Sequence, residues 1–260
     1  MDERHFIQCD INDTVTTLTI DNPPVNALTL EAVQELGHTV QESADNDKVK
    51  VIIVTGAGEK AFCAGTDIKP LATLTQASAR ALAAGGKKAL DQIDQCPKPV
   101  IAAINGICAG GGLEVALACH IRIAADTARL GLPEINIASI PGWGGTQRLP
   151  RAVGDGKALE LMLTGELITA DESLSIGLVQ KVIPYAELSD TAESLARSLS
   201  TKAQLTLRAI LRAAREGANR SPEAGMELET ELFTQVSETF NMKEGASAFL
   251  EKRPPTYRDC

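Results

Sequence analysis

Two glutamates lie in parts of the sequence that are otherwise apolar. Glu114 follows the glycine run at residues 110–112, and Glu134 follows Pro133. Buried carboxylates are costly unless a polar group meets them. Each glutamate has an ordinary explanation, because a helix dipole stabilises an acidic residue in the first turn and a loop carboxylate is normally exposed. Together they predict an acid–base pair: the dipole keeps Glu114 ionised as a base, and mutual repulsion separates the two pKa values.

The glycine run has two interpretations. Glycines permit close packing or a tight turn where a strand meets a helix. Alternatively, the main-chain N–H of Gly111, at the N-terminal end of a helix, binds an oxyanion that develops during a reaction, with the helix dipole behind it. Such an oxyanion hole needs a second donor, which the glycine loop Ala64-Gly65-Thr66 could supply. A thioester carbonyl would suit this site.

Other motifs point away from common cofactor sites. The glycines at 56–61 follow a predicted strand, but no helix opens there to hold a pyrophosphate. The run at 110–112 lacks the Lys-Ser/Thr of a phosphate-binding loop, and no G-x-S-x-G motif is present. The histidines have no zinc-ligand spacing, and His120 at the end of an apolar helix is expected to be structural.

Composition excludes several classes of function. The chain has 260 residues and a net charge of −9, which argues against binding nucleic acid. The apolar stretch 100–125 contains Glu114 and Arg122, so it is not expected to span a membrane, and the acidic N-terminus does not resemble a secretory signal. We expect a soluble, cytoplasmic protein with reduced thiols, because no disulfide framework is apparent in the spacing of Cys9, Cys63, Cys96, Cys108, Cys119 and Cys260.

The elements that must position the glutamates alternate between strands and helices. The pattern predicts a hairpin over 6–20, helices over 30–40 and 71–95, and buried strands at 51–55, from 100 to the break at Gly106, and at 121–125. Residues 59–70 are expected to be irregular, and Gly85-Gly86 a weak point in the second helix. This alternation predicts an α/β fold with a largely parallel, right-handed core.

The C-terminal part of the chain has a different composition. A loop after Glu134 turns into a short helix, a second helix covers 156–163, and a last strand covers 179–183. Beyond Pro184 only helices are predicted, at about 186–199, 203–216 and 222–240, with a boundary near residue 195. These helices either assemble copies of the chain, which predicts a homo-oligomer, or fold back on their own core.

Four segments together resemble the signatures of the enoyl-CoA hydratase/isomerase (crotonase) family. They are FCAGTDIK, IAAINGICAGGGLE, RLGLPEINIASIPGWGGTQRLPRAVG and GASAFLEKR, and the resemblance covers nearly the whole chain. It implies a crotonase-like spiral of ββα units over residues 1–195 and a C-terminal helical trimerisation region over 196–260. It also implies a homotrimer or a dimer of trimers, acting on an acyl-CoA thioester.

The same resemblance implies a role for individual residues. The N–H groups of Thr66, where many relatives have Ala, and Gly111 would form the oxyanion hole. Glu114 would activate water and Glu134 would deliver a proton to C2, with no metal or redox cofactor, since coenzyme A is part of the substrate. The predicted substrate- and coenzyme A-binding residues are Ala64, Gly65, Asp67, Ile68, Lys69, Gly110, Pro133, Pro141, Gly142, Trp143, Phe249 and Lys252, the last two reaching a neighbouring subunit's ligand.

The function that this resemblance implies is hydration of a trans-2-enoyl-CoA, because both glutamates are kept. Trp143 replaces a small residue of several relatives, and we hypothesise that its indole closes the acyl pocket and favours short chains, although it could instead pack at an interface. The alternatives are double-bond isomerisation or hydration of a dienoyl or branched acyl-CoA. From another class, an acyl-CoA-binding or scaffold protein with a vestigial site also fits.

Overall fold

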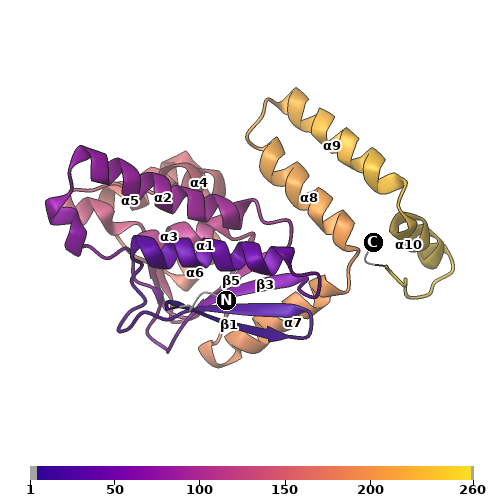
Figure 1. Cartoon of the computed structure of the whole chain (residues 1–260), viewed down its shortest axis with the longest axis horizontal. Helices are drawn as coiled ribbons and strands as arrows, with labels where there is room; N and C mark the ends of the chain where they lie inside the picture. Colours follow the sequence, from indigo (N-terminus) through magenta and orange to yellow (C-terminus); the bar gives the residue numbers. More distant parts are fainter. Residues whose placement is uncertain (1–4, 259–260) are drawn as a thin grey trace.

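The computed structural model describes residues 5–258, and its centre is a six-stranded sheet (Figure 1). The strand order is β1-β2-β3-β5-β7-β10, in which β1 runs antiparallel to β2 and the other neighbours are parallel. The strands are β1 (Ile7–Asn12), β2 (Val15–Ile20), β3 (Val51–Gly56), β5 (Val100–Ile104), β7 (Ile121–Ala125) and β10 (Lys181–Ile183). The predicted hairpin and parallel core are therefore confirmed.

Short strands form a second sheet beside the first. Its order is β4-β6-β8-β9, with β9 antiparallel to β8, and its strands are β4 (Ala61–Cys63), β6 (Ile107–Ala109), β8 (Arg129–Gly131) and β9 (Ile168–Thr169). From β3 to β8, the chain alternates between the sheets, adding one strand to the large sheet and the next to the small one. Helices follow in the units β3-β4-α2 and β5-β6-α3, so the predicted spiral of ββα units is confirmed.

Helices cover both faces of the large sheet, which explains its continuous apolar strands. On one face lie α1 (Leu30–Asp45), α2 (Gln76–Asp94) and α3 (Gly111–Ala118), and on the other lies α7 (Leu188–Ser200). Along β3 the side chains alternate: Ile52 and Val54 belong to the first core and Val51 and Ile53 to the second. Because both faces of the sheet are buried, the ends of its strands are held in fixed positions.

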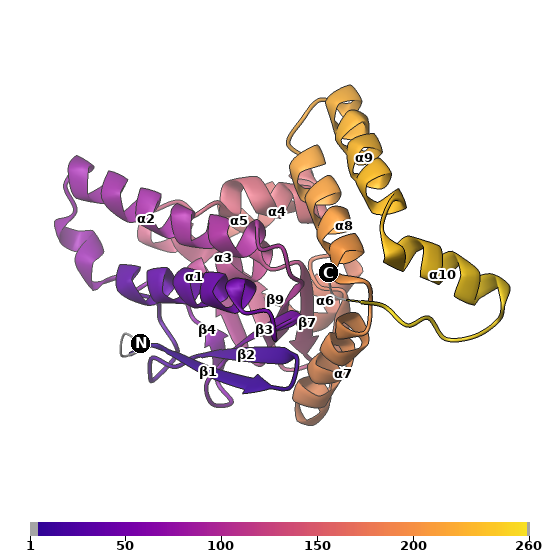
Figure 2. The same cartoon turned by 45° about the vertical axis from the view of Figure 1, so that its right-hand side comes forward.

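The C-terminal helices extend away from this core (Figures 1 and 2). Helix α7 is continuous across residue 195 and packs on the sheet, and the division into a core and an oligomerisation region stays a prediction. The helices not yet described are η1 (Lys69–Thr73), η2 (Pro133–Ile137), α4 (Gly145–Val153), α5 (Asp155–Thr164), α6 (Ala170–Ser175), η3 (Tyr185–Glu187), α8 (Gln204–Gly217), α9 (Pro222–Ser237) and α10 (Phe240–Leu250). Three of these, η1 to η3, are 3₁₀ helices.

Two expectations about local structure were wrong, and one helix was not predicted. The segment expected to be irregular contains strand β4, which pairs with β6. Helix α2 is continuous through Gly85-Gly86, because these glycines let it approach α1 and the Trp143 indole closely. The predicted helix over 222–240 is confirmed as α9, but α10 was not predicted; Thr239 caps α10 by accepting the N–H of Met242.

Buried polar groups outside the glutamate pair are structural. Nδ1 of His120 accepts the N–H of Val100 at 2.9 Å, and burial lowers the pKa of His120 to about 4, so its structural role is confirmed. Burial raises the pKa of the Cys63 and Cys119 thiols to about 12, and that of Cys96 to about 11. The expectations about residues 1–4 and Cys260 lie outside the described residues.

The part of the chain that the structure describes has neither a membrane-spanning helix nor a metal-binding cluster. None of the helices between residues 5 and 258 is both long and apolar enough to cross a membrane. The apolar stretch 100–125 instead forms β5, β6, α3 and β7. In the same part of the chain, no cluster of His, Cys, Asp and Glu side chains has the arrangement to hold a metal ion.

Candidate active site

A cavity of about 580 Å³ lies between α2, α3, η2 and the loop before α4. Most of the residues predicted for the site line it together: Ala64, Gly65, Thr66, Ile68, Gly110, Gly111, Glu114, Pro133, Glu134, Pro141, Gly142 and Trp143. Sequence positions as distant as 64 and 143 therefore meet around one space. The lining is largely apolar, so the few polar groups that face it dominate its chemistry.

The main chain at Thr66 and Gly111 has the geometry of two adjacent donors. Thr66 forms a parallel bridge with Leu28, in which the flanking Gly65 C=O and Asp67 N–H bond Leu28. In extended chain, successive peptide groups face opposite ways, so the Thr66 N–H faces away from Leu28. A Cβ at Gly111 would lie 2.7 Å from Thr66 Oγ1, which shows how closely the two residues approach.

Gly111 is the first residue of α3, and its N–H belongs to the helical turn that has no partner within the helix. The preceding Gly110 has φ +52° and ψ −126°, a conformation that glycine adopts readily. This explains the glycine run chemically: one glycine makes the turn, and the next brings bare main chain to the cavity. The oxyanion hole of Thr66 and Gly111 remains a prediction that this geometry supports.

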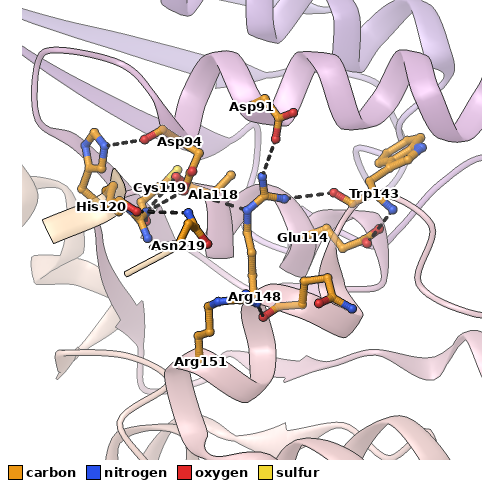
Figure 3. Close-up of polar contacts among 12 residues, drawn as sticks. Asp91, Asp94, Glu114, Ala118, Cys119, His120, Trp143, Arg148, Arg151 and Asn219 are labelled. Atoms are coloured by element: carbon orange, nitrogen blue, oxygen red, sulfur yellow. Dashed lines mark hydrogen bonds and ion pairs between the residues drawn. The ribbon is translucent and has the colours of Figure 1, made fainter. Parts of the chain in front are cut away.

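Glu114 is held rigidly at the cavity wall. Its side chain is buried, and Oε1 accepts two main-chain N–H groups. One is from Trp143 at 2.8 Å (Figure 3), and the other is from Gly145 at 2.7 Å. Burial raises the pKa of Glu114, although the two N–H donors and the Arg148 charge oppose this. Desolvation is the largest of these effects, and the expected role of the helix dipole in keeping Glu114 ionised stays a prediction.

Glu134 faces the same cavity from the first turn of η2. Burial raises its pKa to about 7, and the negative charge of Glu114 contributes to the rise. Repulsion between the two glutamates therefore contributes to the raised pKa of Glu134, as the sequence analysis predicted. Burial, which the sequence did not reveal, is the larger cause. Among the described residues, Glu134 Oε2 is a buried oxygen without a hydrogen-bond partner. A group with this pKa can donate a proton near neutral pH.

The Trp143 side chain forms the wall of the cavity next to α2. Its indole is 3% exposed, packs against Gly86 and Gly111, and donates from Nε1 to the Leu82 carbonyl at 3.3 Å. These contacts all lie within one chain. The indole is therefore already buried and does not need an interface with another subunit to cover it. The main-chain N–H of the same residue binds Glu114, which joins the wall to the acid–base pair.

Some predicted residues do not line the cavity within one chain. Asp67 Oδ1 accepts the Lys69 N–H at 3.1 Å in an exposed turn beside it. Phe249 is 83% exposed at the end of α10, and Lys252 follows it, in the arm away from the core (Figure 2). Their contact with a neighbouring subunit's ligand stays a prediction.

Sequence reasoning missed several apolar residues that line the cavity. They are Leu71 and Leu74 around η1, Ala79, Leu82 and Ala83 on α2, and Ile137 and Ile140 around η2. The three on α2 follow helical spacing, so the signal was present in the sequence. It was indistinguishable from the signal of an ordinary core-facing helix, because both patterns place apolar residues on one side.

Comparison with known proteins gives the family. The family model described as enoyl-CoA hydratase/isomerase matches residues 10–260. A Bacillus subtilis (strain 168) protein named "Probable enoyl-CoA hydratase" is 42% identical over 254 residues, which cover 97% of this chain and 98% of the relative. A crotonyl-CoA hydratase of Syntrophomonas wolfei is 40% identical, with 94% and 95% covered.

Solved structures agree with this result. The crystal structure of an enoyl-CoA hydratase from Bacillus anthracis superposes with a TM-score of 0.92 at 38% identity, covering 97% of this chain and 99% of that one. The chain belongs to the enoyl-CoA hydratase/isomerase family and has its crotonase fold. The resemblance seen in the sequence motifs is thereby confirmed.

Proposed function

We propose that this chain adds water reversibly to a trans-2-enoyl-CoA, giving the 3-hydroxyacyl-CoA, and that its substrates have short acyl chains. Membership of the family and whole-length similarity to a protein named crotonyl-CoA hydratase support the activity. The observation that carries the proposal is the convergence of Glu114, Glu134 and the Thr66–Gly111 main chain on one cavity. Hydration needs a base that activates water and an acid that protonates C2, and two carboxylates facing one cavity can supply both.

The reaction begins with polarisation of the thioester. The N–H groups of Thr66 and Gly111 hold the carbonyl oxygen, and the dipole of α3 stabilises the charge that develops there. Because the double bond is conjugated to this carbonyl, electron density moves toward the oxygen and C3 becomes electrophilic. Loss of one such donor typically costs about 10²–10³ in rate. The oxyanion hole therefore makes C3 electrophilic without help from another charged group.

The glutamates then supply the elements of water. Glu114, fixed through Oε1, takes a proton from a water molecule as the water oxygen bonds to C3. Glu134, with its pKa near 7, delivers its own proton to C2 as the enolate collapses. The proton gained by Glu114 passes back through shared hydrogen bonds to restore the pair. The raised pKa of each carboxyl group suits transfer near neutral pH.

The shape of the cavity supports the preference for short chains. The Trp143 indole is fixed by Leu82 and Gly86 where the cavity meets α2, so a long acyl chain would have to displace a packed aromatic ring. Coenzyme A would lie along the loop 64–69, with Lys69 facing its phosphates and Phe249 and Lys252 of another subunit beside it. No separate cofactor is needed, since the chemistry above uses only proton transfer and hydrogen bonding.

Assembly and location complete the proposal. The exposed apolar side chains of the C-terminal arm, such as Ile210, Met226, Phe233 and Phe249, would be covered in a homotrimer or a dimer of trimers. A cytoplasmic location would suit the buried thiols of Cys63, Cys96, Cys108 and Cys119, none of which is in a disulfide.

The test is turnover of crotonyl-CoA, followed by loss of the conjugated thioester absorbance, in wild type, Glu114→Gln and Glu134→Gln. We expect rapid turnover in wild type and loss in both variants. Binding without turnover would support a scaffold, and dependence on only one glutamate would support isomerisation. A panel of straight, branched and dienoyl thioesters compared by kcat/KM then identifies the acyl group.

A further inference from the structure

Arg148, on the second turn of α4, lies behind the catalytic pair. Its Nη1 donates to the Trp143 carbonyl at 3.0 Å (Figure 3), and its main-chain N–H donates to the Gly144 carbonyl at 2.8 Å. The guanidinium packs directly against Gly144, which has φ +115°. The side chain thus holds the Trp143 carbonyl, whereas the bond to the Gly144 carbonyl is the first main-chain hydrogen bond of α4.

These two carbonyls are next to the amides that bind Glu114. The Gly144 carbonyl and the Gly145 N–H belong to one peptide group, which accepts from Arg148 on one side and donates to Glu114 Oε1 on the other. The Trp143 carbonyl belongs to the preceding peptide group, and the Trp143 N–H is the second donor to Oε1. The Trp143 carbonyl that the guanidinium binds therefore lies between the two main-chain amides that bind Glu114, so a change in the backbone at Trp143 would disturb both sets of contacts.

Arg148 is in turn held from the opposite side by α2. Its Nη2 donates to Asp91 Oδ1 at 2.9 Å, and Nε lies 3.9 Å from Asp94 Oδ1. Asp91 also pairs with Lys87, and Asp94 with Arg215 of α8. The guanidinium is only 16% exposed, and its planar fork suits simultaneous bonds to a carboxylate and a carbonyl. The arrangement is a fixed bridge from α2 to the loop that clamps Glu114.

We propose that Arg148 is a positioning residue for Glu114, holding the Trp143 and Gly145 amides in the geometry that orients the carboxylate toward water. Its charge has a second effect on the same group, because a nearby cation favours the ionised carboxylate and lowers the pKa of Glu114. The inference rests on the proposed role of Glu114 as the base. Arg148 itself does not line the cavity.

The charged groups around this contact define what a pH measurement reports. Arg148 faces the carboxylates of Asp91 and Asp94 from α2, and Glu114 faces Glu134 from η2 together with Arg148 from α4. Removal of the Arg148 charge should therefore raise the pKa of Glu114. Ionisation of the base then requires a higher pH, so the acid limb of kcat/KM moves upward.

The experiment compares Arg148→Met, Arg148→Lys and Arg151→Met in crotonyl-CoA hydration across pH. Arg151 is the matched control, because it lies on the same helix but is exposed and bonds the Gln147 carbonyl (Figure 3). We expect Arg148→Met to lower kcat by about tenfold to a hundredfold with little change in KM, and to move the acid limb upward. Arg148→Lys keeps the charge, so its acid limb stays in place while kcat remains below wild type. Arg151→Met behaves as wild type.

Three outcomes would overturn the inference. The first is wild-type kcat in Arg148→Met, and the second is a lower kcat with an unmoved acid limb, which a merely structural anchor would give. If Arg148→Met does not fold, Arg148→Lys decides, and wild-type kcat in that variant is the third. Glu114→Gln separates this result from the proposed function: if that variant is fully active, the assignment of the base is wrong, whatever Arg148 does.

Discussion

The main-chain N–H of Gly145 donates to Oε1 of Glu114 over 2.7 Å, so the first turn of α4 fixes a carboxylate that α3 carries. A Cβ on Gly145 would lie 3.1 Å from that same oxygen and 2.8 Å from Pro141. The absence of a side chain at residue 145 is therefore what lets the two helices meet at the site. The orientation of the base is decided by main-chain geometry.

Glu114→Gln is expected to lower kcat by about 10²–10⁴ while leaving the fold intact. The amide oxygen can still accept the Trp143 and Gly145 N–H groups, but it cannot take a proton from water. Burial no longer carries the cost of an ionised group, so thermal stability should be equal to or above that of wild type. Absorbance assays and thermal unfolding measure both effects, and activity within tenfold of wild type would contradict the assignment.

The pH dependence of kcat/KM should have an alkaline limb near pH 7. The active pair holds one proton, and Glu134, with a pKa of about 7, loses it as pH rises. Hydration and dehydration should show the same limb, because their kcat/KM ratio is an equilibrium constant without net proton uptake. Initial rates of hydration across pH check the position of the limb, and a kcat/KM that does not fall as pH rises through about 7 would contradict the assignment of this proton to Glu134.

Glu134 should also make stability depend on pH. Its pKa rises from 4.5 to about 7 on folding, so its contribution is fully present below pH 4.5 and is lost as pH rises through about 7. Glu134→Gln has no charge to bury, and it should therefore exceed wild type in melting temperature at pH 8 but not at pH 4.5. Equal differences at both pH values would show that the carboxyl group is not desolvated.

Gly111→Ala should impair the oxyanion hole. The new Cβ would lie 2.7 Å from Thr66 Oγ1 and 2.9 Å from the Trp143 ring, which forces the donors apart, and kcat should fall by about 10²–10³. Gly156→Ala is the control, because that glycine of α5 has no other group within 4 Å of its Cβ position. Thr66→Ala keeps the main-chain donor and should retain wild-type kcat; a large loss there would assign a role to the hydroxyl.

Trp143→Ala should extend the acyl specificity. Removal of the indole opens the cavity toward Leu82 and Gly86, so the ratio of kcat/KM for a four-carbon over a ten-carbon enoyl-CoA should fall by about tenfold. The buried ring also contributes about 3–5 kcal/mol to stability, so the fold must be checked by thermal unfolding. An unchanged ratio in a folded variant would refute the role of the indole in selecting short chains.

The sequence motifs predicted the chemistry of the site better than its surroundings. Glu114, Glu134 and Gly111 stand out because a charged residue or a glycine run is rare in an apolar segment. Strand β4 was missed because three residues carry almost no periodicity, and its pairing with β6 depends on chain elements far apart. The surroundings of Glu114 could not be predicted for the same reason, since the Trp143 and Gly145 amides that bind its carboxylate come from a distant part of the sequence.

The buried cysteines can be used to detect local unfolding of this enzyme. Cys63 lies in the small sheet and Cys119 at the end of α3, and burial keeps both as protonated thiols at neutral pH. A thiol in this state is a poor nucleophile and is out of reach of an alkylating reagent. The rate of labelling at either position would therefore report how often the structure around the predicted oxyanion hole unfolds locally.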